Sequence, residues 1–232
     1  MSVHALIPAA GRSVRFGGTT LKQYAHLLSI PVIAHSIEAA RSHPLIGGVT
    51  VVLAPDDGIF EQLVRPYFPD VRAVPGGDSR AESVMNGLRS IRARDAACET
   101  VVVHDAARPC LPPDALARLL EQGLASEDGA ILAMPVSDTL KRAGPDGRIS
   151  STLDRSDCWA AQTPQLFRLD RLIPALESAL EAGEQPTDEA AAMERAGYRP
   201  LLVRGSGSNI KITGPEDLAL AQFILQRRSL DR

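Results

Sequence analysis

Cysteine is scarce in this sequence, and its few occurrences lie far apart. Cys98, Cys110 and Cys158 form no CxxC pair and no spacing typical of a zinc site. An odd number of widely spaced thiols suits a reducing compartment, in which cysteines stay unpaired. We therefore expect a cytoplasmic protein.

Long apolar runs and an excess of positive charge are also missing. No stretch approaches the roughly 18 apolar residues of a membrane span. The apolar run at the N-terminus is short and ends at Pro8, unlike a signal peptide. The formal net charge is −3 and the pI about 6.0, so nothing indicates binding to nucleic acid or to a membrane surface. Any cationic site must be built locally.

Lysine is the rarest charged residue. Lys and Arg together number 25, and all but three of them are arginine. The three are Lys22, Lys141 and Lys211. A compact ammonium is not interchangeable with a guanidinium, so these lysines are candidates for specific roles.

Length and composition are those of a globular protein. The 232 residues fit one large domain, and the 44% hydrophobic and 23% charged fractions are ordinary. We find no internal repeat, low-complexity segment or linker, and expect a single domain over residues 1–232.

Apolar runs alternate with helical patterns along the first 136 residues. Strands are predicted over residues 3–7, 49–53, 71–74, 99–104 and 130–136, and helices over 31–41, 58–67, 79 to about 91, and 112–124. Ser79 and Glu82 have the spacing of a capping box. Four strand–helix alternations predict an α/β fold whose mostly parallel sheet is flanked by helices.

The pattern changes after residue 136. Residues 138–142 and 148–153 are polar, strand-like runs around the turn Gly144-Pro145-Asp146-Gly147. Such a hairpin has too few apolar residues for the main core and needs another surface, so we expect a protruding arm over residues 137–158. Further helices are predicted over residues 169–181, after Thr187 and over residues 215–226. The Thr187 hydroxyl could cap the second of these helices. Short strands are predicted over residues 201–203 and 209–212.

The loop after the first strand has the composition of an anion site. Ala9, Ala10 and Gly11 let a ligand approach the main chain, and Arg12, Arg15 and Lys22 add positive charge. The loop matches neither a dinucleotide GxGxxG motif nor a Walker A motif. The less favoured alternative is a strand-to-helix turn with solvated arginines.

A second signal, His104-Asp105-Ala106-Ala107-Arg108-Pro109, follows the fourth strand. Ligands of open α/β sheets bind beyond the carboxyl ends of the strands. A carboxylate there suits Mg²⁺, and Arg108 could clamp an anion. From the residues alone, Asp105 can equally be a helix N-cap.

Polar and cationic residues recur in the later loops, at Asp138-Thr139, Arg155, residues 162–165, Thr187-Asp188-Glu189 and residues 208–211. Each alone reads as a turn or a cap. No Ser–His–Asp order, HExxH motif or paired-glutamate motif competes for the assignment.

Taken in order, eight motifs resemble one family: PAAGRSVRFG…LKQY, GGDSRAESV, VHDAARP, DTLKR, LDR, TPQLF, TDEAA and NIKIT. The chain is similar to 2-C-methyl-D-erythritol 4-phosphate cytidylyltransferases of the non-mevalonate isoprenoid pathway over residues 8 to about 218. The motifs are individually weak, but their ordered set is specific. At Ser13 and Leu21 this chain departs from the family, which usually has glycine and proline there, while Arg15 and Lys22 stay in register.

The resemblance implies a Rossmann-like nucleotidyltransferase fold and a homodimer whose arms embrace. It also implies the transfer of CMP from CTP to 2-C-methyl-D-erythritol 4-phosphate, with Mg²⁺ bound and pyrophosphate released.

The resemblance also implies residue roles. Small residues and backbone groups would surround the cytidine: Ala9, Ala10, Gly11, Gly77, Asp78 and Ser83. Asp105 would hold the metal, and Arg15 and Lys22 would stabilise the reacting phosphates. The sugar phosphate would be bound by Arg108, Thr163, Thr187 and Lys211, together with Thr139 and Arg155 from the partner's arm.

Two other functions remain open on the sequence. A ribitol 5-phosphate cytidylyltransferase shares these motifs, and a nucleotide-sensing protein could keep the fold without turnover. Retention of Arg15, Lys22, Asp105 and Lys211 together argues against the second.

Overall fold

A seven-stranded sheet forms the centre of the computed structural model, which describes residues 2–11 and 21–230. The strand order is β11 (Leu201–Arg204), β7 (Ala130–Pro135), β10 (Trp159–Arg168), β6 (Thr100–Val103), β1 (Val3–Pro8), β4 (Ile46–Leu53) and β5 (Arg72–Pro75). Only β10 runs antiparallel to its two neighbours in this sheet. The mostly parallel α/β fold that the sequence predicts is confirmed.

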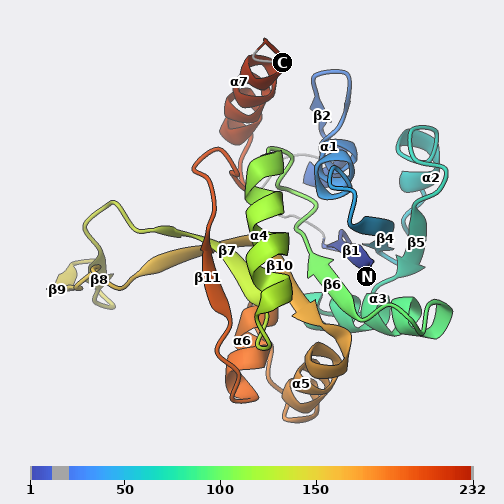
Figure 1. Cartoon of the computed structure of the whole chain (residues 1–232). Helices are drawn as coiled ribbons and strands as arrows, with labels where there is room; N and C mark the ends of the chain where they lie inside the picture. The colour runs from blue at the N-terminus through green and yellow to red at the C-terminus, as the bar shows by residue number, and fades with distance from the viewer. Residues whose placement is uncertain (1, 12–20, 231–232) are drawn as a thin grey trace.

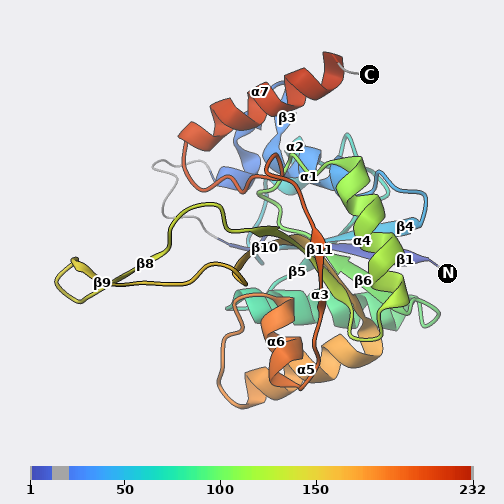
Figure 2. The same cartoon turned by 60° about the vertical axis from the view of Figure 1, so that its left-hand side comes forward.

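Helices cover both faces of this sheet, as Figures 1 and 2 show. On one face lie α1 (Val32–Ala40), the short α2 (Phe60–Leu63) and α4 (Pro113–Ala125); on the other lie α3 (Arg80–Arg94), α5 (Leu169–Glu181) and α6 (Glu189–Arg195). Strand β1 shows why both faces are apolar: Ala5 and Ile7 join the first core, while Leu6 joins the second, because alternate side chains point to opposite faces.

The last helix, α7 (Glu216–Leu230), packs beside the two-residue strand β2 (His26–Leu27), which pairs with β3 (Ile30–Pro31). The short 3₁₀ helix η2 (Lys22–Tyr24) comes just before β2 in the chain. A third, smaller apolar cluster joins Ala221 of α7 to Leu27. Within the described ranges, no helix is both long enough and apolar enough to cross a membrane.

Helix α3 begins at a polar cap, as the sequence predicts. The Ser79 hydroxyl accepts a hydrogen bond from the Glu82 N–H at 3.1 Å. The Glu82 carboxylate reaches back to the N–H of Asp78, at 2.8 Å, instead of that of Ser79. The first turn of α3 and the loop before it are thereby tied together.

Strand β10 corrects the sequence analysis, which places residues 162–165 in a loop. These residues lie within a ten-residue strand between β6 and β7. Pro164 disfavours a strand interior because it has no N–H to donate, and the pairing with β7 shifts register between Ala161 and Gln165. The proline is therefore accommodated where the ladder is irregular.

The short strand expected over residues 209–212 does not form. In its place the segment is held by single contacts, among them a hydrogen bond from the Ile212 N–H to the Ala107 carbonyl at 2.8 Å. The helix that forms within residues 58–67 is also shorter than predicted. Only Phe60–Leu63 is helical, and the chain then continues in turns. Phe60, fully buried in the core, anchors this short helix.

The cap of α6 is not Thr187. The carboxylate of Asp188 accepts the hydrogen bond from the Ala191 N–H at 2.9 Å, and Asp188 is the N-cap residue. A carboxylate is at least as good a cap as a threonine hydroxyl, and its charge favours the positive end of the helix. Thr187 is left exposed just before the helix.

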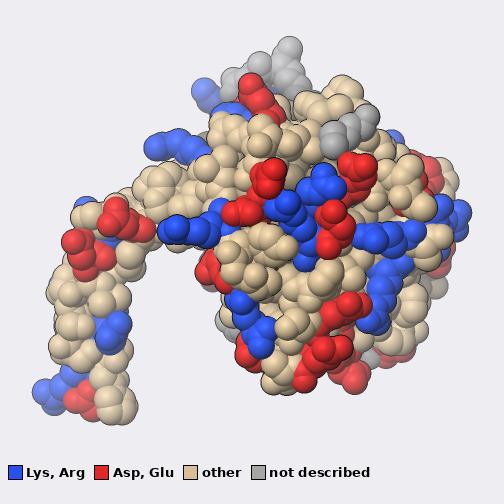
Figure 3. Space-filling model, turned by 60° about the horizontal axis from the view of Figure 1, so that its bottom comes forward, with Lys and Arg blue, Asp and Glu red and all other residues tan. Residues whose placement is uncertain are grey.

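The predicted hairpin forms an arm that projects from the body (Figures 1 and 3). Its antiparallel strands are β8 (Lys141–Ala143) and β9 (Ile149–Thr152), somewhat shorter than expected. Every residue of both strands is exposed, including Ile149. The described part of the single chain therefore gives the arm no apolar surface to rest on.

Candidate active site

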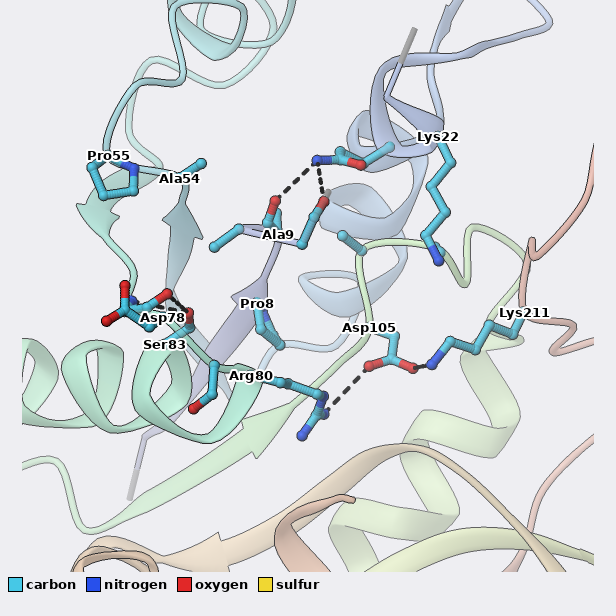
Figure 4. A pocket seen from close by; sticks show the side chains of 17 residues that line it. Pro8, Ala9, Lys22, Ala54, Pro55, Asp78, Arg80, Ser83, Asp105 and Lys211 are labelled. Atoms are coloured by element: carbon cyan, nitrogen blue, oxygen red, sulfur yellow. Dashed lines mark hydrogen bonds and ion pairs between the residues drawn. The ribbon is translucent and has the colours of Figure 1, made fainter. Parts of the chain in front are cut away.

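A pocket of about 540 Å³ opens at the carboxyl ends of the adjacent parallel strands β1, β4, β5 and β6 (Figure 4). Segments distant in sequence meet there, as expected at the carboxyl edge of an α/β sheet. The lining residues are Pro8, Ala9, Ala10, Gly11, Lys22, Gln23, Ala54, Pro55, Gly77, Asp78, Ser79, Arg80, Ser83, Asp105, Ala106, Ala107 and Lys211. Nine of the residues to which the sequence analysis gives a role in the site are among them.

One wall of the pocket is main chain from the first loop. Gln23, buried in η2, donates from Nε2 to the carbonyls of Ala9 at 3.0 Å and Gly11 at 3.3 Å. The two bonds hold the start of this loop against η2. The other carboxamide atom of this side chain, Oε1, is buried without a partner among the described residues.

The opposite wall is the turn before α3. A Cβ at Gly76 would lie 2.7 Å from both the Ala10 Cβ and the Ser83 Oγ, and the Gly77 N–H donates to that same hydroxyl at 3.1 Å. Only glycine permits this close approach of the two walls. Backbone and small side chains thus shape a narrow part of the pocket.

Asp105 is the acidic centre of the pocket. Its side chain is 11% exposed, and Oδ2 lies 2.7 Å from Lys211 Nζ while Oδ1 lies 3.4 Å from Arg80 Nη2. Burial by itself would raise the pKa of Asp105, but Lys211, Arg80 and then Arg108 outweigh it and hold the pKa well below its usual range. The carboxylate stays ionised at neutral pH.

Arg80 links Asp105 to a second, deeper carboxylate. Glu189, 1% exposed, receives Arg80 Nη1 at 2.6 Å on one oxygen and Nη2 at 3.3 Å on the other. Burial raises the pKa of Glu189 and Arg80 opposes that rise, while for Arg80 burial is outweighed by the two carboxylates, which raise its pKa. The charges therefore form one connected network.

Behind Asp105 lies a buried polar layer. Thr163 Oγ1 accepts the Asp105 N–H at 3.0 Å and lies 3.1 Å from His104 Nδ1. The guanidinium of Arg108 donates to the Asn209 carbonyl at 2.7 Å. Arg108 and Thr163 are among the residues expected to bind the acceptor; they lie next to Asp105 but do not line the pocket.

The cations expected at the reacting phosphates are placed in part. Lys22 and Lys211 line the pocket from different segments, and Figure 4 shows both side chains directed toward the Asp105 side of it. Arg15 lies outside the described residues. Thr139 and Arg155 are exposed on the arm and do not line the pocket of their own chain.

Three polar residues of this region were given no role in the site from the sequence: Gln23, Arg80 and Glu189. Gln23 and Glu189 look like ordinary polar residues of a loop and a helix start. Arg80 carries a signal, since it is the first residue of α3, where the helix dipole disfavours a cation. A cation at that position needs a carboxylate nearby.

Within residues 2–11 and 21–230, no group of three or more His, Cys, Asp and Glu residues is arranged to hold a metal ion. The carboxylate of Asp105 does open on the pocket. A single carboxylate fits Mg²⁺ when substrate phosphates and water supply the other ligands, whereas it would not make an all-protein metal cage.

Comparison with known proteins gives a consistent result. The family model of 2-C-methyl-D-erythritol 4-phosphate cytidylyltransferase matches residues 3–227. The protein of that name from Tolumonas auensis is 45% identical over 227 residues, covering 98% of each chain. The one from Stenotrophomonas maltophilia is 48% identical over 228 residues, again covering 98% of each.

Solved structures agree in fold. A crystal structure of 4-diphosphocytidyl-2C-methyl-D-erythritol synthase superposes with a TM-score of 0.85 at 42% identity, covering 97% of this chain and 98% of that one. The cytidylyltransferase from Thermus thermophilus gives a TM-score of 0.80 at 29% identity, covering 97% and 100%. The names of these relatives give methylerythritol as the acceptor, so ribitol 5-phosphate is not favoured.

Proposed function

The chain belongs to the 2-C-methyl-D-erythritol 4-phosphate cytidylyltransferase family, and from this premise we propose which of its residues carry the reaction. The enzyme transfers CMP from CTP to 2-C-methyl-D-erythritol 4-phosphate and releases pyrophosphate. The acceptor phosphate is already ionised near neutral pH, so no strong general base is needed. The obstacle is the repulsion between two anions as they approach in line.

The nucleoside of CTP binds between the two walls of the pocket. Small residues and backbone groups, namely Ala9, Ala10, Gly11, Gly77, Asp78 and Ser83, surround the cytidine. The narrow passage at Gly76 supports this assignment, because a flat pyrimidine needs close approach to main chain and a larger purine is excluded by shape.

Lys22, with Arg15, binds the triphosphate and stabilises the charge that develops on the α-phosphate and on the departing pyrophosphate. Asp105 holds Mg²⁺, which neutralises phosphate charge when bound. The ionised, partly buried carboxylate on the pocket wall supports this role. Each preorganised cation of this kind typically lowers the barrier by about 3–4 kcal/mol.

The acceptor binds on the Lys211 side of the pocket. Lys211 holds its phosphate and aligns it with the α-phosphate, and Arg108, Thr163 and Thr187 shape the surroundings of Lys211 and Asp105. Thr139 and Arg155 reach the same site from the arm of the partner subunit in a homodimer. Alignment of this kind contributes up to roughly 7–11 kcal/mol.

The assembly and its surroundings follow from the same proposal. One domain over residues 1–232 carries the site, and its arm over residues 137–158 grips the second subunit. Cys98, Cys110 and Cys158 are free, which suits a reducing compartment. The cytoplasm is therefore the proposed location.

The observation that carries the proposal is the convergence of Lys22, Asp105 and Lys211, from three distant segments, on one pocket. The test is an assay of pyrophosphate release with CTP, Mg²⁺ and either acceptor. Turnover with 2-C-methyl-D-erythritol 4-phosphate is expected. Turnover with ribitol 5-phosphate alone would overturn the acceptor, and CTP binding without any turnover would identify a nucleotide sensor.

The role of Asp105 is tested separately by Asp105→Asn, which keeps the size of the side chain but removes its charge. The variant is expected to lose at least about a hundredfold in turnover. Wild-type turnover would overturn the assignment of Asp105.

A further inference from the structure

The pair formed by Arg80 and Glu189 has no role in the assignments above. Arg80 is the first helical residue of α3, where the positive end of the helix dipole disfavours a guanidinium. Its side chain is nonetheless only 31% exposed and extends along the pocket wall toward Asp105 (Figure 4). A residue kept at a locally unfavourable position is held there by its partners.

Its main partner is buried. Glu189 is 1% exposed, and both of its oxygens receive nitrogens of the Arg80 guanidinium, at 2.6 and 3.3 Å. An arginine–carboxylate pair with two such bonds is fixed in orientation as well as in distance. Glu189 does not line the pocket, so it has no direct route to a ligand there.

The Arg80 guanidinium is shared between two carboxylates. Its Nη2 lies 3.3 Å from Glu189 and 3.4 Å from Asp105 Oδ1, while Asp105 Oδ2 is left to Lys211 at 2.7 Å. Without Glu189, the guanidinium would be free to turn and take both oxygens of Asp105, the arrangement that such a pair prefers. Glu189 therefore limits how much of Asp105 the arginine can occupy.

We propose that Glu189 is a positioning residue for the transfer reaction, which acts through Arg80 to fix the Asp105 carboxylate and to leave its Oδ2 to Lys211. The inference rests on the proposed function of Asp105. It also ties the start of α6, next to Thr187 on the acceptor side, to the start of α3 on the CTP side. The Arg80 guanidinium then fixes the CTP side of the site relative to the acceptor side.

The first test is Glu189→Gln, which keeps the shape of the side chain but removes its charge. Partners that orient a functional side chain are typically worth about 10–100-fold in activity, so kcat is expected to fall by that amount. The KM for CTP is expected to change by less than about threefold, because Glu189 acts on the reaction step and not on nucleotide binding.

The matched control is Glu177→Gln. Glu177 also pairs with an arginine of α3, Arg89, at 2.9 Å, but both side chains are more exposed and neither lines the site. The control is expected to keep wild-type kcat and KM. Thermal unfolding of both variants shows whether each is folded under assay conditions.

A double-variant cycle separates positioning from a general structural role. If Glu189 acts through Arg80, then Glu189→Gln has no further effect on kcat in an Arg80→Met background. If the two effects multiply, Glu189 acts independently of Arg80 and the proposal is overturned. Wild-type kcat in Glu189→Gln alone overturns it as well.

If Glu189→Gln does not fold, the variant Arg80→Lys tests the positioning role instead. A lysine reaches the pocket wall but cannot serve both carboxylates with a planar fork, so kcat is expected to fall by about tenfold or more. An unchanged kcat overturns the inference.

Asp105→Asn shows whether it is the role of Asp105 or only that of Glu189 that fails. An active Asp105→Asn enzyme means that the proposed function of Asp105 has failed. An inactive one beside a normal Glu189→Gln enzyme means that only the further inference has failed.

Discussion

Most of the polar residues at this pocket are charged, and the burial and ion pairs of each side chain determine its ionisation and its freedom to bind a ligand. Asp105 is buried enough to be costly and yet stays ionised, because three cations surround it at 2.7, 3.4 and 3.8 Å. Lys211, 42% exposed, is the one of these partners with most freedom to turn toward a ligand. An arriving phosphate therefore competes with Asp105 for the ammonium.

The two pocket lysines should each matter greatly to turnover. We predict that Lys22→Ala and Lys211→Ala each reduce kcat by at least about a hundredfold, given what one preorganised cation contributes to a transition state. The measurement is steady-state pyrophosphate release. Arg89→Ala, at an exposed cation outside the pocket, serves as the control, and near-normal rates in either purified lysine variant would contradict the assigned role.

His104 should make stability depend on pH. Burial lowers the pKa of His104 from 6.5 to about 4, so between these values the unfolded chain binds a proton that the folded chain does not. Stability should therefore fall as the pH falls from about 6.5 to about 4, by about 3 kcal/mol from His104. Burial lowers the pKa of His4 to about 4 as well and acts in the same sense, while the raised pKa of Glu189 opposes both.

Urea unfolding at pH 7 and pH 5 checks this prediction. The variant His104→Gln should show a weaker loss of stability over that interval than the wild type. The exposed His26 provides the control, since His26→Gln should keep the wild-type dependence. An identical pH dependence in all three proteins would show that His104 is not the cause.

At the residue scale, the motifs contain the charged residues of the pocket but do not show which of them pair. Asp105 and Lys211 stand in recognisable motifs, and the structure places them 2.7 Å apart. Arg80 and Glu189 also stand in two of these motifs, GGDSRAESV and TDEAA, but they are 109 positions apart, and neither has a neighbour in sequence that hints at the other. Such a pair can be found only once α3 and α6 are known to meet at the same edge of the sheet.

Helices and strands were predictable where the periodicity of their hydrophobic residues is clear. The five strands of the main sheet up to β7 and the helices α1, α3 and α4 follow from buried apolar runs and a helix cap, whereas β10 was missed because Pro164 interrupts it. The strand prediction for residues 209–212 failed for the opposite reason, because the alternating pattern there suits a strand but no strand forms. The segment instead makes single hydrogen bonds with the 105–108 loop and with Gln162 and Thr163. Local pattern cannot tell a paired strand from an extended loop that other residues hold.

The position of α3 depends on a glycine. A Cβ at Gly87 would lie 2.4 Å from a methyl carbon of Leu6 and 2.9 Å from one of Val52, both fully buried. We predict that Gly87→Ala lowers the free energy of unfolding by about 1–3 kcal/mol, because overpacking outweighs the better helix propensity of alanine.

Equilibrium unfolding in urea measures this change. Gly58→Ala is the control, because a Cβ there meets nothing within 4 Å. A Gly87→Ala protein as stable as the wild type would show that α3 can move away from β1 without cost. Since α3 carries Ser83 in its first turn and directly follows the loop with Asp78, the same shift should raise the KM for CTP.

At the scale of the whole molecule, the arm is the part that the single chain does not explain. The alternation of strands and helices predicted the body of the fold, and the pocket lies at the carboxyl edge of the parallel strands, where ligands of such sheets bind. The same sequence rules predicted a hairpin without an apolar face, and the structure leaves β8 and β9 fully exposed. Thr139 and Arg155, expected at the site, lie on this arm and not at the pocket of their own chain.

Exchange of arms between two copies would account for both features, and subunit mixing tests it. Arg155→Ala and Lys22→Ala homodimers should each be nearly inactive, because every site in them lacks one cation. In a heterodimer of the two, one site combines an intact Lys22 with the intact arm of the other subunit, while its counterpart lacks both. Random exchange between equal amounts should therefore restore about a quarter of the wild-type activity, since half of the dimers are mixed and each has one good site of two.

The matched control mixes Arg155→Ala with a second arm variant, Thr139→Ala. No gain over the separate homodimers is expected from this mixture, because every site in it still receives a changed arm. A gain in the first mixture and none in the second would therefore locate the complementation between the arm of one subunit and the pocket of the other. If demonstrated subunit exchange between Arg155→Ala and Lys22→Ala recovers no activity, the arm does not complete the partner's site.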